Sequence, residues 1–240
     1  NFKKYPSMTE AIIPDLVELP GDGLYNAFYN MQNLKAINIP NSVCNISNMC
    51  RNCRNLTGSP ICGNDVTDMS NAYANCQNLT GFPVCGDKVT NMSGAYRYCS
   101  NLTGNPACGA NVTNMYQAYE FCHNLTGNPV CGNKVTNMHT AYHNCFNITG
   151  SPVCGENVTN MFAAYSNCYN LTGNPVCGNK VTDISYAYDY CYNLHGTMEI
   201  FSKNIKSVAG CFTGRNTSNR LNIYVYNGST THNTIRNKIT

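Results

Sequence analysis

The sequence predicts an α/β repeat solenoid whose coils each consist of a short helix plus a short extended segment, with a period of 23 residues. The first observation behind this prediction is an apolar residue at a constant step, found as Met69, Met92, Met115, Met138, Met161 and Ile184. The second is a cysteine with the same step, found as Cys76, Cys99, Cys122, Cys145, Cys168 and Cys191. A fixed period between about 20 and 50 residues is typical of arrays in which each copy packs on its neighbours.

The segment that begins at each methionine is predicted to be the short helix. Four residues of it lie at i, i+3, i+4 and i+7, namely Met92, Ala95, Tyr96 and Cys99. This spacing places them on one face of a helix, which we expect to be core. The residue before the methionine, such as Asn91, is a good N-cap type because its side chain can accept a hydrogen bond from the first turn. We therefore expect the helix to start at a defined residue.

A turn and a short extended segment complete each coil. Leu102 can point inward, and Gly104 permits a tight bend. The segment that follows, residues 105–109, contains Pro106, which lacks the N–H that a sheet ladder needs. The extended segment is therefore expected to be short.

Three regions follow from the extent of the repeat. Residues 1–20 are expected to form an N-terminal cap, and residues 21–195 a solenoid of about eight coils. Caps are expected because an open solenoid end exposes core. Residues 196–240 are expected to contain a degenerate last coil, an edge strand and a polar tail. The alternation in residues 221–226 predicts the edge strand, and the tail from Asn227 is interpreted as a linker.

The composition argues against several classes of function. Charged residues make up only 11% of the chain and the net charge is +3, so there is no electrostatic footprint for nucleic acid. No apolar run approaches the length of a membrane span, and no membrane insertion is expected. The sequence offers no Ser-His-Asp set, paired catalytic carboxylates or phosphate-binding glycine loop. We expect neither enzyme activity nor a cofactor.

The motif in residues 89–103, Val-Thr-Asn-Met-x-x-Ala-Tyr-x-x-Cys-x-Asn-Leu-Thr, resembles the repeat of BspA-type leucine-rich repeat surface proteins of bacteria, protozoa and some bacteriophages. The first coil, residues 24–43, is closer still to the common form, with an Ala-Phe pair and an Ile-x-Ile-Pro strand. The resemblance covers roughly residues 17–195. It implies leucine-rich-repeat-like coils and a location that is extracellular, on a cell surface or on a virion surface. The later coils carry Asn-Pro-Val-Cys in place of the apolar strand, which argues against a long regular sheet.

Most of the sixteen cysteines fall into two series with the period of the repeat. The first cysteine series is Cys53, Cys76, Cys99, Cys122, Cys145, Cys168 and Cys191. The second cysteine series is Cys62, Cys85, Cys108, Cys131, Cys154 and Cys177. One disulfide per coil, between cysteines nine residues apart, would imply an oxidising compartment. The alternative, which the resemblance favours for the first series, is free thiols that act as small apolar residues. Zinc is less favoured, because no compact Cys-x-x-Cys pairs recur with a matching His pair.

Two histidines have a spacing that could hold a metal. His139 and His143 lie at i and i+4 on the outward side of the expected helix, with His123 in the preceding coil. Nothing else in the sequence supports a metal site, so solvent-facing or ligand-contacting histidines are favoured and no metal is predicted.

The positions that vary from copy to copy are the candidate binding site. They lie after each Met, Tyr and Cys of the repeat, outside the core spacing. There the chain places Tyr98, Tyr116, Phe121, His123, His139, His143, Phe146, Phe162, Tyr169, Tyr186 and Tyr190. Rigid aromatics among Ser, Gly and Asn are typical of binding surfaces, and aromatic platforms also suit sugar rings. The alternative is that these rings pack on neighbouring coils and stabilise the stack.

These observations lead to two hypotheses of function. The first is a non-enzymatic recognition or adhesion module on a bacterial surface or a phage virion, where it would attach to a host and bind a cell-surface glycan or protein. The second is a structural virion, sheath or filament component that self-assembles as a homo-oligomer through residues 221–226. The phage hypothesis comes from the family resemblance.

Overall fold

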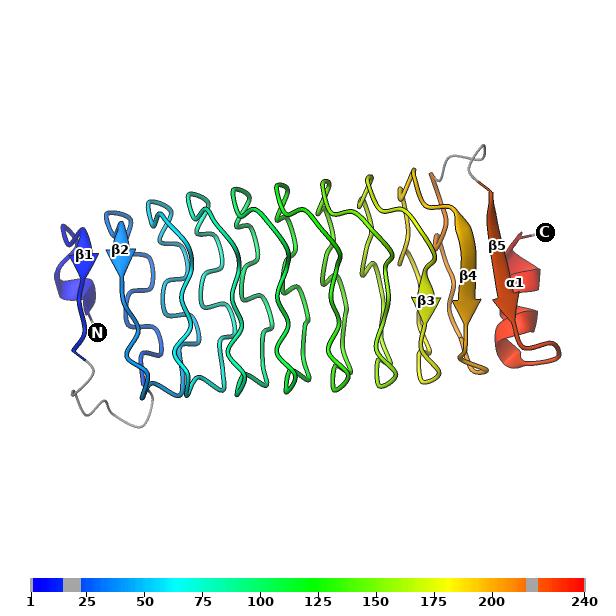
Figure 1. The fold of residues 1–240 in the computed structure, drawn as a ribbon, viewed down its shortest axis with the longest axis horizontal. Coiled ribbons are helices and arrows are strands. Elements are labelled where there is room, and N and C mark those ends of the chain that lie inside the picture. Colours follow the sequence, from blue (N-terminus) through cyan, green and yellow to red (C-terminus); the bar gives the residue numbers. More distant parts are fainter. Residues whose placement is uncertain (1, 15–22, 215–219, 240) are drawn as a thin grey trace.

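The computed structural model describes residues 2–14, 23–214 and 220–239. They form one elongated stack of coils, with the two termini at opposite ends (Figure 1). The regular elements are η1 Phe2–Lys4, β1 Glu10–Ala11, β2 Ala36–Ile37, β3 Val176–Cys177, β4 Gly196–Ile200, β5 Leu221–Val225 and α1 Thr230–Ile239. Strands β1 and β2 pair in parallel, and β3, β4 and β5 form a parallel three-stranded sheet in that order.

Single parallel bridges hold the other coils in register. They connect Asn45, Asp68, Asn91, Asn114, Asn137, Asn160 and Asp183 in turn, each 23 residues after the one before. Asp183 is in turn bridged to Ser207, in the degenerate last coil. The chain is therefore a repeat fold, as the sequence predicts.

The prediction of a short helix in each coil is wrong, and so is the α/β assignment of the repeats. In residues 92–99, the N–H groups of Ala95, Arg97 and Cys99 donate to the carbonyl three residues earlier, at 3.0–3.1 Å. The alternate N–H groups donate to the next coil, in the pairs Gly94 to Tyr116, Tyr96 to Ala118 and Tyr98 to Glu120. An α-helix would instead bond its N–H groups to carbonyls four residues back in the same segment. We call this run of overlapping turns, in residues 92–99 and their equivalents, the turn ribbon.

Left-handed residues interrupt any helix in the turn ribbon. Gly94 and Tyr98 both have a φ of 61°, and each ribbon in the described residues has two such residues four positions apart. A type II turn needs a positive φ at its third residue, which suits Gly and Asn. Helical spacing could not reveal this, because the ribbon buries the same four residues that a helix would bury. Asn91 accepts a hydrogen bond from the Ser93 N–H at 3.1 Å, as an Asx turn and not as a helix cap.

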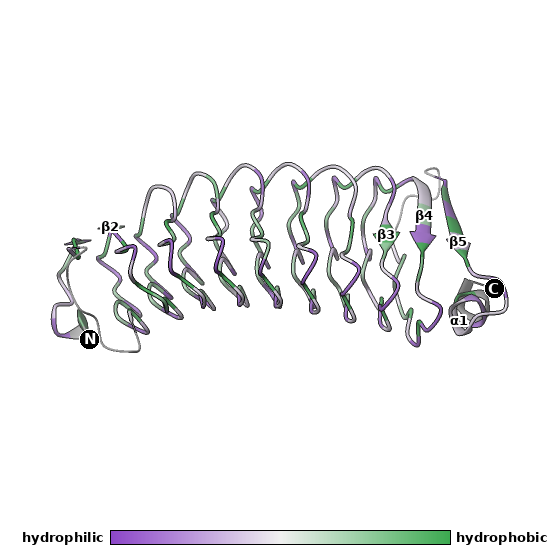
Figure 2. Ribbon diagram, turned by 60° about the horizontal axis from the view of Figure 1, so that its bottom comes forward, coloured by the Kyte–Doolittle hydropathy of each residue, from purple (hydrophilic) through white to green (hydrophobic). Residues whose placement is uncertain are grey.

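The core is a narrow column to which every coil contributes the same side chains. In the fourth coil Val89, Met92, Ala95, Tyr96 and Leu102 are all fully buried. The buried tyrosine rings stack with centroids 5.4–5.7 Å apart, in the order Tyr73, Tyr96, Tyr119, Tyr142, Tyr165 and Tyr188. Apolar and polar stretches alternate along each coil (Figure 2). The apolar side chains named above are buried inside the stack.

The N-terminal end of the stack is covered by the first residues of the chain. Strand β1 pairs with β2, and the Phe2 ring stacks on Phe28 with centroids 4.7 Å apart. The rest of the expected N-terminal cap, residues 15–22, lies outside the described residues.

The C-terminal end is covered by α1, which corrects the prediction of a polar linker. The Thr231 hydroxyl donates to the Ser202 carbonyl at 2.7 Å and accepts from the Ile205 N–H at 2.9 Å. Thr231 and Ile235, four residues apart, are buried on one side of the helix. Strand β5 is the edge strand that the alternation predicts. None of the described helices has the length and apolarity needed to cross a membrane.

Candidate binding surface

The turn ribbons carry the predicted binding residues in columns along the stack. Ring contacts sort them into two groups. The aromatic network consists of Tyr98, Phe121, His123, His143, Phe146, Tyr169, Tyr190 and Tyr192. The aromatic column consists of Tyr116, His139, Phe162 and Tyr186.

Stacked and edge-on contacts together make the aromatic network continuous. Rings stack from coil to coil at 4.5 Å for His123 on Phe146, 5.0 Å for Phe146 on Tyr169 and 5.1 Å for Tyr169 on Tyr192. A second stack, Tyr98 on Phe121, has centroids 4.5 Å apart. Edge-on contacts of 6.1 Å and 5.7 Å join Phe121 to His123 and to His143, and one of 5.9 Å joins Tyr190 to Tyr192.

Stacking decides which part of each ring a ligand can reach. Phe146 and Tyr169 have a stacked neighbour on both sides, so their faces are covered and their edges remain accessible. A sugar ring therefore cannot lie flat on these interior rings, as the idea of an aromatic platform would require. Four members stay exposed to about two fifths of their surface, namely Tyr116 at 37%, Tyr186 at 42%, Tyr190 at 41% and Tyr192 at 39%.

Several of these aromatics occupy left-handed backbone positions. Tyr98, Phe121, Tyr186 and Tyr190 have φ between 54° and 63°. The first three ribbons use only Asn there, at Asn26, Asn30, Asn48, Asn52, Asn71 and Asn75. A bulky residue at such a φ costs about 1–2 kcal/mol, which Asn and Gly largely avoid. The helix prediction missed this cost, because a helix has no left-handed positions.

One ion pair, between Arg97 and Glu120, lies beside the aromatic network. The Arg97 guanidinium lies 2.5 Å from the Glu120 carboxylate and 4.9 Å from the centre of the Tyr98 ring. Burial raises the pKa of Glu120, and the Arg97 charge acts in the opposite direction. The network therefore presents aromatic edges and polar groups with little net charge.

Burial lowers the pKa of His123, His139 and His143, so these imidazoles favour their neutral form. The Nδ1 atom of His143 is buried without a hydrogen-bond partner among the described residues. His139 and His143 belong to different groups of rings, because His139 stacks on Phe162 and His143 meets Phe121 edge-on. The part of the chain that the structure describes contains no cluster of three or more His, Cys, Asp or Glu side chains suited to a metal ion.

All sixteen cysteines are free thiols. Those of the first cysteine series are buried and donate to ribbon carbonyls; Cys122, for example, donates to the Tyr96 carbonyl at 3.0 Å. In the second series, the thiols from Cys62 to Cys154 each lie against a glycine of the next coil, as Cys108 lies against Gly132. The two thiols of one coil therefore have different surroundings.

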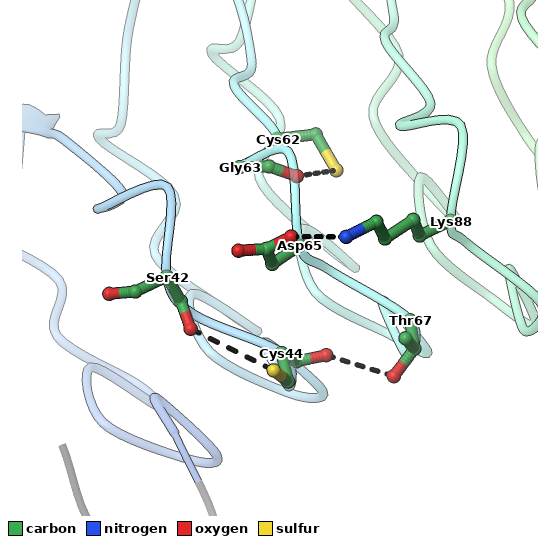
Figure 3. Close-up of polar contacts among 7 residues, drawn as sticks. All are labelled: Ser42, Cys44, Cys62, Gly63, Asp65, Thr67 and Lys88. Atoms are coloured by element: carbon green, nitrogen blue, oxygen red, sulfur yellow. Dashed lines mark hydrogen bonds and ion pairs between the residues drawn. The ribbon is translucent and has the colours of Figure 1, made fainter.

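A polar edge of the coils is separate from the ring contacts. Lys88 lies 2.5 Å from the Asp65 carboxylate of the preceding coil, and the Thr67 hydroxyl donates to the Cys44 carbonyl at 3.1 Å (Figure 3). The threonine contact repeats along the stack at Thr90, Thr113, Thr136, Thr159 and Thr182. These groups satisfy one another between coils, so they stabilise the stack.

The model of the BspA type leucine rich repeat region matches residues 2–103, with 6 copies. No curated protein and no solved structure matches the chain significantly. The matched residues form the N-terminal part of the stack, and later coils continue it through the same bridges. The resemblance seen in the sequence is thereby confirmed: residues 2–103 carry the repeat of BspA-type leucine-rich repeat proteins.

Proposed function

We propose that the protein is a non-enzymatic recognition or adhesion module that acts outside the cell, on a bacterial surface or on a phage virion during host attachment. It binds a glycan or a protein through the aromatic network and the aromatic column. The repeat type supports a surface location and a binding role. A solenoid presents one extended face, on which many weak contacts can add up.

The observation that carries this proposal is the placement of Tyr98, Phe121, Tyr186 and Tyr190 at left-handed positions. The chain has a less costly solution, Asn, at the same positions of its first three ribbons. Ring stacking offsets part of the cost for Tyr98 and Phe121. The ring contacts of Tyr186 and Tyr190 are edge-on, and their rings lie against Gly210 and Gly214 of the following coil. About two fifths of each residue nevertheless remains exposed, which leaves both rings accessible to a ligand.

The geometry of the rings narrows the chemistry of binding. Because interior faces are covered, a ligand meets ring edges, tyrosine hydroxyls and imidazole nitrogens. These groups suit a partner rich in hydrogen-bonding groups, such as sugar hydroxyls or a polar protein surface.

The test replaces aromatic residues at left-handed positions by Asn, the residue that the first three ribbons carry there. A Tyr98→Asn, Phe121→Asn and Tyr190→Asn variant removes three rings of the aromatic network and relieves left-handed strain, so it should fold at least as well as the parent. We expect its affinity for intact bacterial cells or for an array of bacterial surface glycans to fall at least about tenfold. Fluorescently labelled protein and surface plasmon resonance give the measurement.

The matched control is Phe82→Asn. Phe82 is an exposed aromatic, at 67%, outside both groups of rings, and the equivalent positions hold Asn105 and Asn128. This variant should bind like the parent. The proposal fails if the triple variant keeps the parent's affinity, or if the parent binds neither cells, glycans nor their surface proteins.

A structural component that self-assembles is the second candidate. Strand β5 is a sheet edge; Tyr224, within it, is 63% exposed, and Tyr226, directly after it, is 49% exposed. The N–H and C=O groups along an edge strand can pair with another chain. Sedimentation decides between the two: concentration-dependent growth into long oligomers that Tyr224→Lys abolishes favours assembly, whereas a monomer that binds cells favours recognition.

A further inference from the structure

The second cysteine series forms a column of thiols that runs along the stack, one thiol per coil. Near the C-terminal end of this column, the N–H of Cys154 donates to the Val176 carbonyl at 3.1 Å, and Val176 donates back to the Pro152 carbonyl at 3.1 Å. The bridge Val153↔Val176 fixes the register. Cys154 and Cys177 are therefore direct neighbours on adjacent parallel segments.

This placement satisfies the distance requirement of a disulfide. Neighbouring strands lie about 4.8 Å apart, and disulfides form between Cα atoms about 4.4–6.8 Å apart. The alternative pairing, between cysteines nine residues apart in one coil, is not supported by any backbone pairing of the two residues among the described part of the chain. Cys168, the partner of Cys177 in that scheme, donates its thiol to the Tyr142 carbonyl at 3.0 Å.

The two thiols also act on each other. A hydrogen bond from Cys177 lowers the pKa of Cys154, and the same contact together with burial raises the pKa of Cys177. The Gly178 N–H donates to the Cys154 sulfur at 3.0 Å, which further favours its thiolate. By contrast, burial raises the pKa of the next thiol in the column, Cys131, to about 12, so that thiol stays protonated.

A solvent-accessible groove leads to this pair. It has a volume of about 790 Å³, and Cys154, Gly178, Phe201, Lys203 and Tyr226 are among its lining residues. The Lys203 ammonium group lies 4.6 Å from the centre of the Tyr226 ring, so the groove is lined by one positively charged side chain close to an aromatic ring. Cys154 lines this groove with 4% of its surface exposed, whereas Cys177 has no exposed surface, so a small reagent in the groove meets Cys154 first.

We propose that Cys154 and Cys177 form a disulfide between adjacent coils when the protein meets a small-molecule disulfide. The Cys154 thiolate attacks one sulfur of the reagent, breaks its S–S bond and releases one thiolate. Cys177 then loses its proton and attacks the Cys154 sulfur, which releases the second thiolate. Two electrons pass to the reagent, and the two protons of the cysteines end on the two released thiols. The new bond fastens the coil that contains β3 to the coil before it.

The experiment treats the full chain with oxidised glutathione at about pH 8 and locates the bond by mass spectrometry without reduction. Cleavage after Glu120, Glu156 and Glu199 places Cys154 and Cys177 in separate fragments, residues 121–156 and 157–199. We expect these two fragments to be joined through Cys154 and Cys177. The melting temperature of the treated protein should rise by about 5–10 °C.

Two single substitutions supply the controls. Cys177→Ala should prevent the joining of the fragments, whereas Cys145→Ala, in the first cysteine series, should leave it unchanged. The proposal is overturned if no thiols are lost from the parent protein. It is equally overturned if the bond found is Cys131 to Cys154, or lies within one coil as Cys168 to Cys177.

Discussion

At the scale of the residue, one backbone position holds very different side chains in successive coils. The left-handed position of Gly94 holds Gln117, Thr140, Ala163 and Tyr186 in the next four, with φ between 48° and 56°. The N–H of each donates to a carbonyl of the following coil. The hydrogen bonds between coils therefore fix the backbone and leave the side chain free to vary, at a cost of about 1–2 kcal/mol for a bulky residue.

Thr140 is the most strained of these residues, because it is β-branched and has a φ of 49°. We expect Thr140→Asn to raise the free energy of unfolding by about 0.5–1 kcal/mol, since Asn tolerates this φ. Urea denaturation gives the measurement. Thr136→Asn is the matched control: Thr136 does not have a positive φ and donates to the Thr113 carbonyl at 3.1 Å, so this change should destabilise. Equal effects of the two changes would contradict the role of backbone strain.

The histidines of the binding surface should make stability depend on pH. Burial lowers the pKa of His123, His139 and His143. Their contribution is present in full above the unfolded pKa of about 6.5 and is lost as pH falls through the folded pKa values. Glu120 and Asp189, whose pKa values burial raises, act in the opposite sense but at lower pH.

We therefore expect the urea midpoint to fall as the pH is lowered from about 7.5 to about 6. A variant with His123→Phe and His139→Phe keeps aromatic rings in both stacks and should lose less stability over this range. If parent and variant respond alike, other groups are responsible.

At the scale of the element, buried tyrosine hydroxyls connect five of the turn ribbons to the extended segment before them, at Tyr73, Tyr96, Tyr119, Tyr142 and Tyr165. The Tyr119 hydroxyl donates to the Ala107 carbonyl at 2.5 Å and accepts from the Ala107 N–H at 3.0 Å. Tyr188 is the last of the stacked core tyrosines, and its hydroxyl is buried without a partner among the described residues. The aromatic that follows in the stack is Phe212, which needs no partner.

This difference predicts opposite results for one substitution at two sites. Tyr119→Phe should lower the free energy of unfolding by about 1–2 kcal/mol, because it leaves the Ala107 backbone groups unpaired. Tyr188→Phe should be neutral or slightly stabilising, since it removes an unpaired buried hydroxyl. Chemical denaturation of both variants gives the comparison. A loss at Tyr188 as large as that at Tyr119 would show that the hydroxyls act through packing and not through hydrogen bonds.

The turn ribbon also shows how far the sequence could be interpreted. The spacing of Met92, Ala95, Tyr96 and Cys99 correctly predicts that these residues are buried. It could not distinguish a helix from overlapping turns, since both bury the same positions. The Asn residues at positions 71 and 75 were a usable signal, because two Asn four residues apart suit left-handed turns better than a helix interior.

At the scale of the whole molecule, the stack turns positions that are 23 residues apart in sequence into neighbours. The sequence identified eleven outward residues, and ring contacts then sort them into two groups. That division depends on the direction in which each side chain leaves the coil. A helix and a turn ribbon give the same residue different directions. The sequence also did not predict that α1 covers the end of the stack. The helix is mostly polar, and its buried face consists of only Thr231 and Ile235 among the described side chains.

The register between coils predicts which internal deletions the stack tolerates. Removing residues 116–138 takes out one complete coil and joins Met115 to His139, so the remaining bridges can form again across the gap. We expect this variant to unfold cooperatively with somewhat lower stability, since each coil depends mainly on its neighbours. Removing residues 116–135 leaves three extra residues and displaces every later turn ribbon against its partner. This shorter deletion should give a protein that limited proteolysis degrades readily. If both variants resist proteolysis equally, the hydrogen bonds between coils do not determine the register.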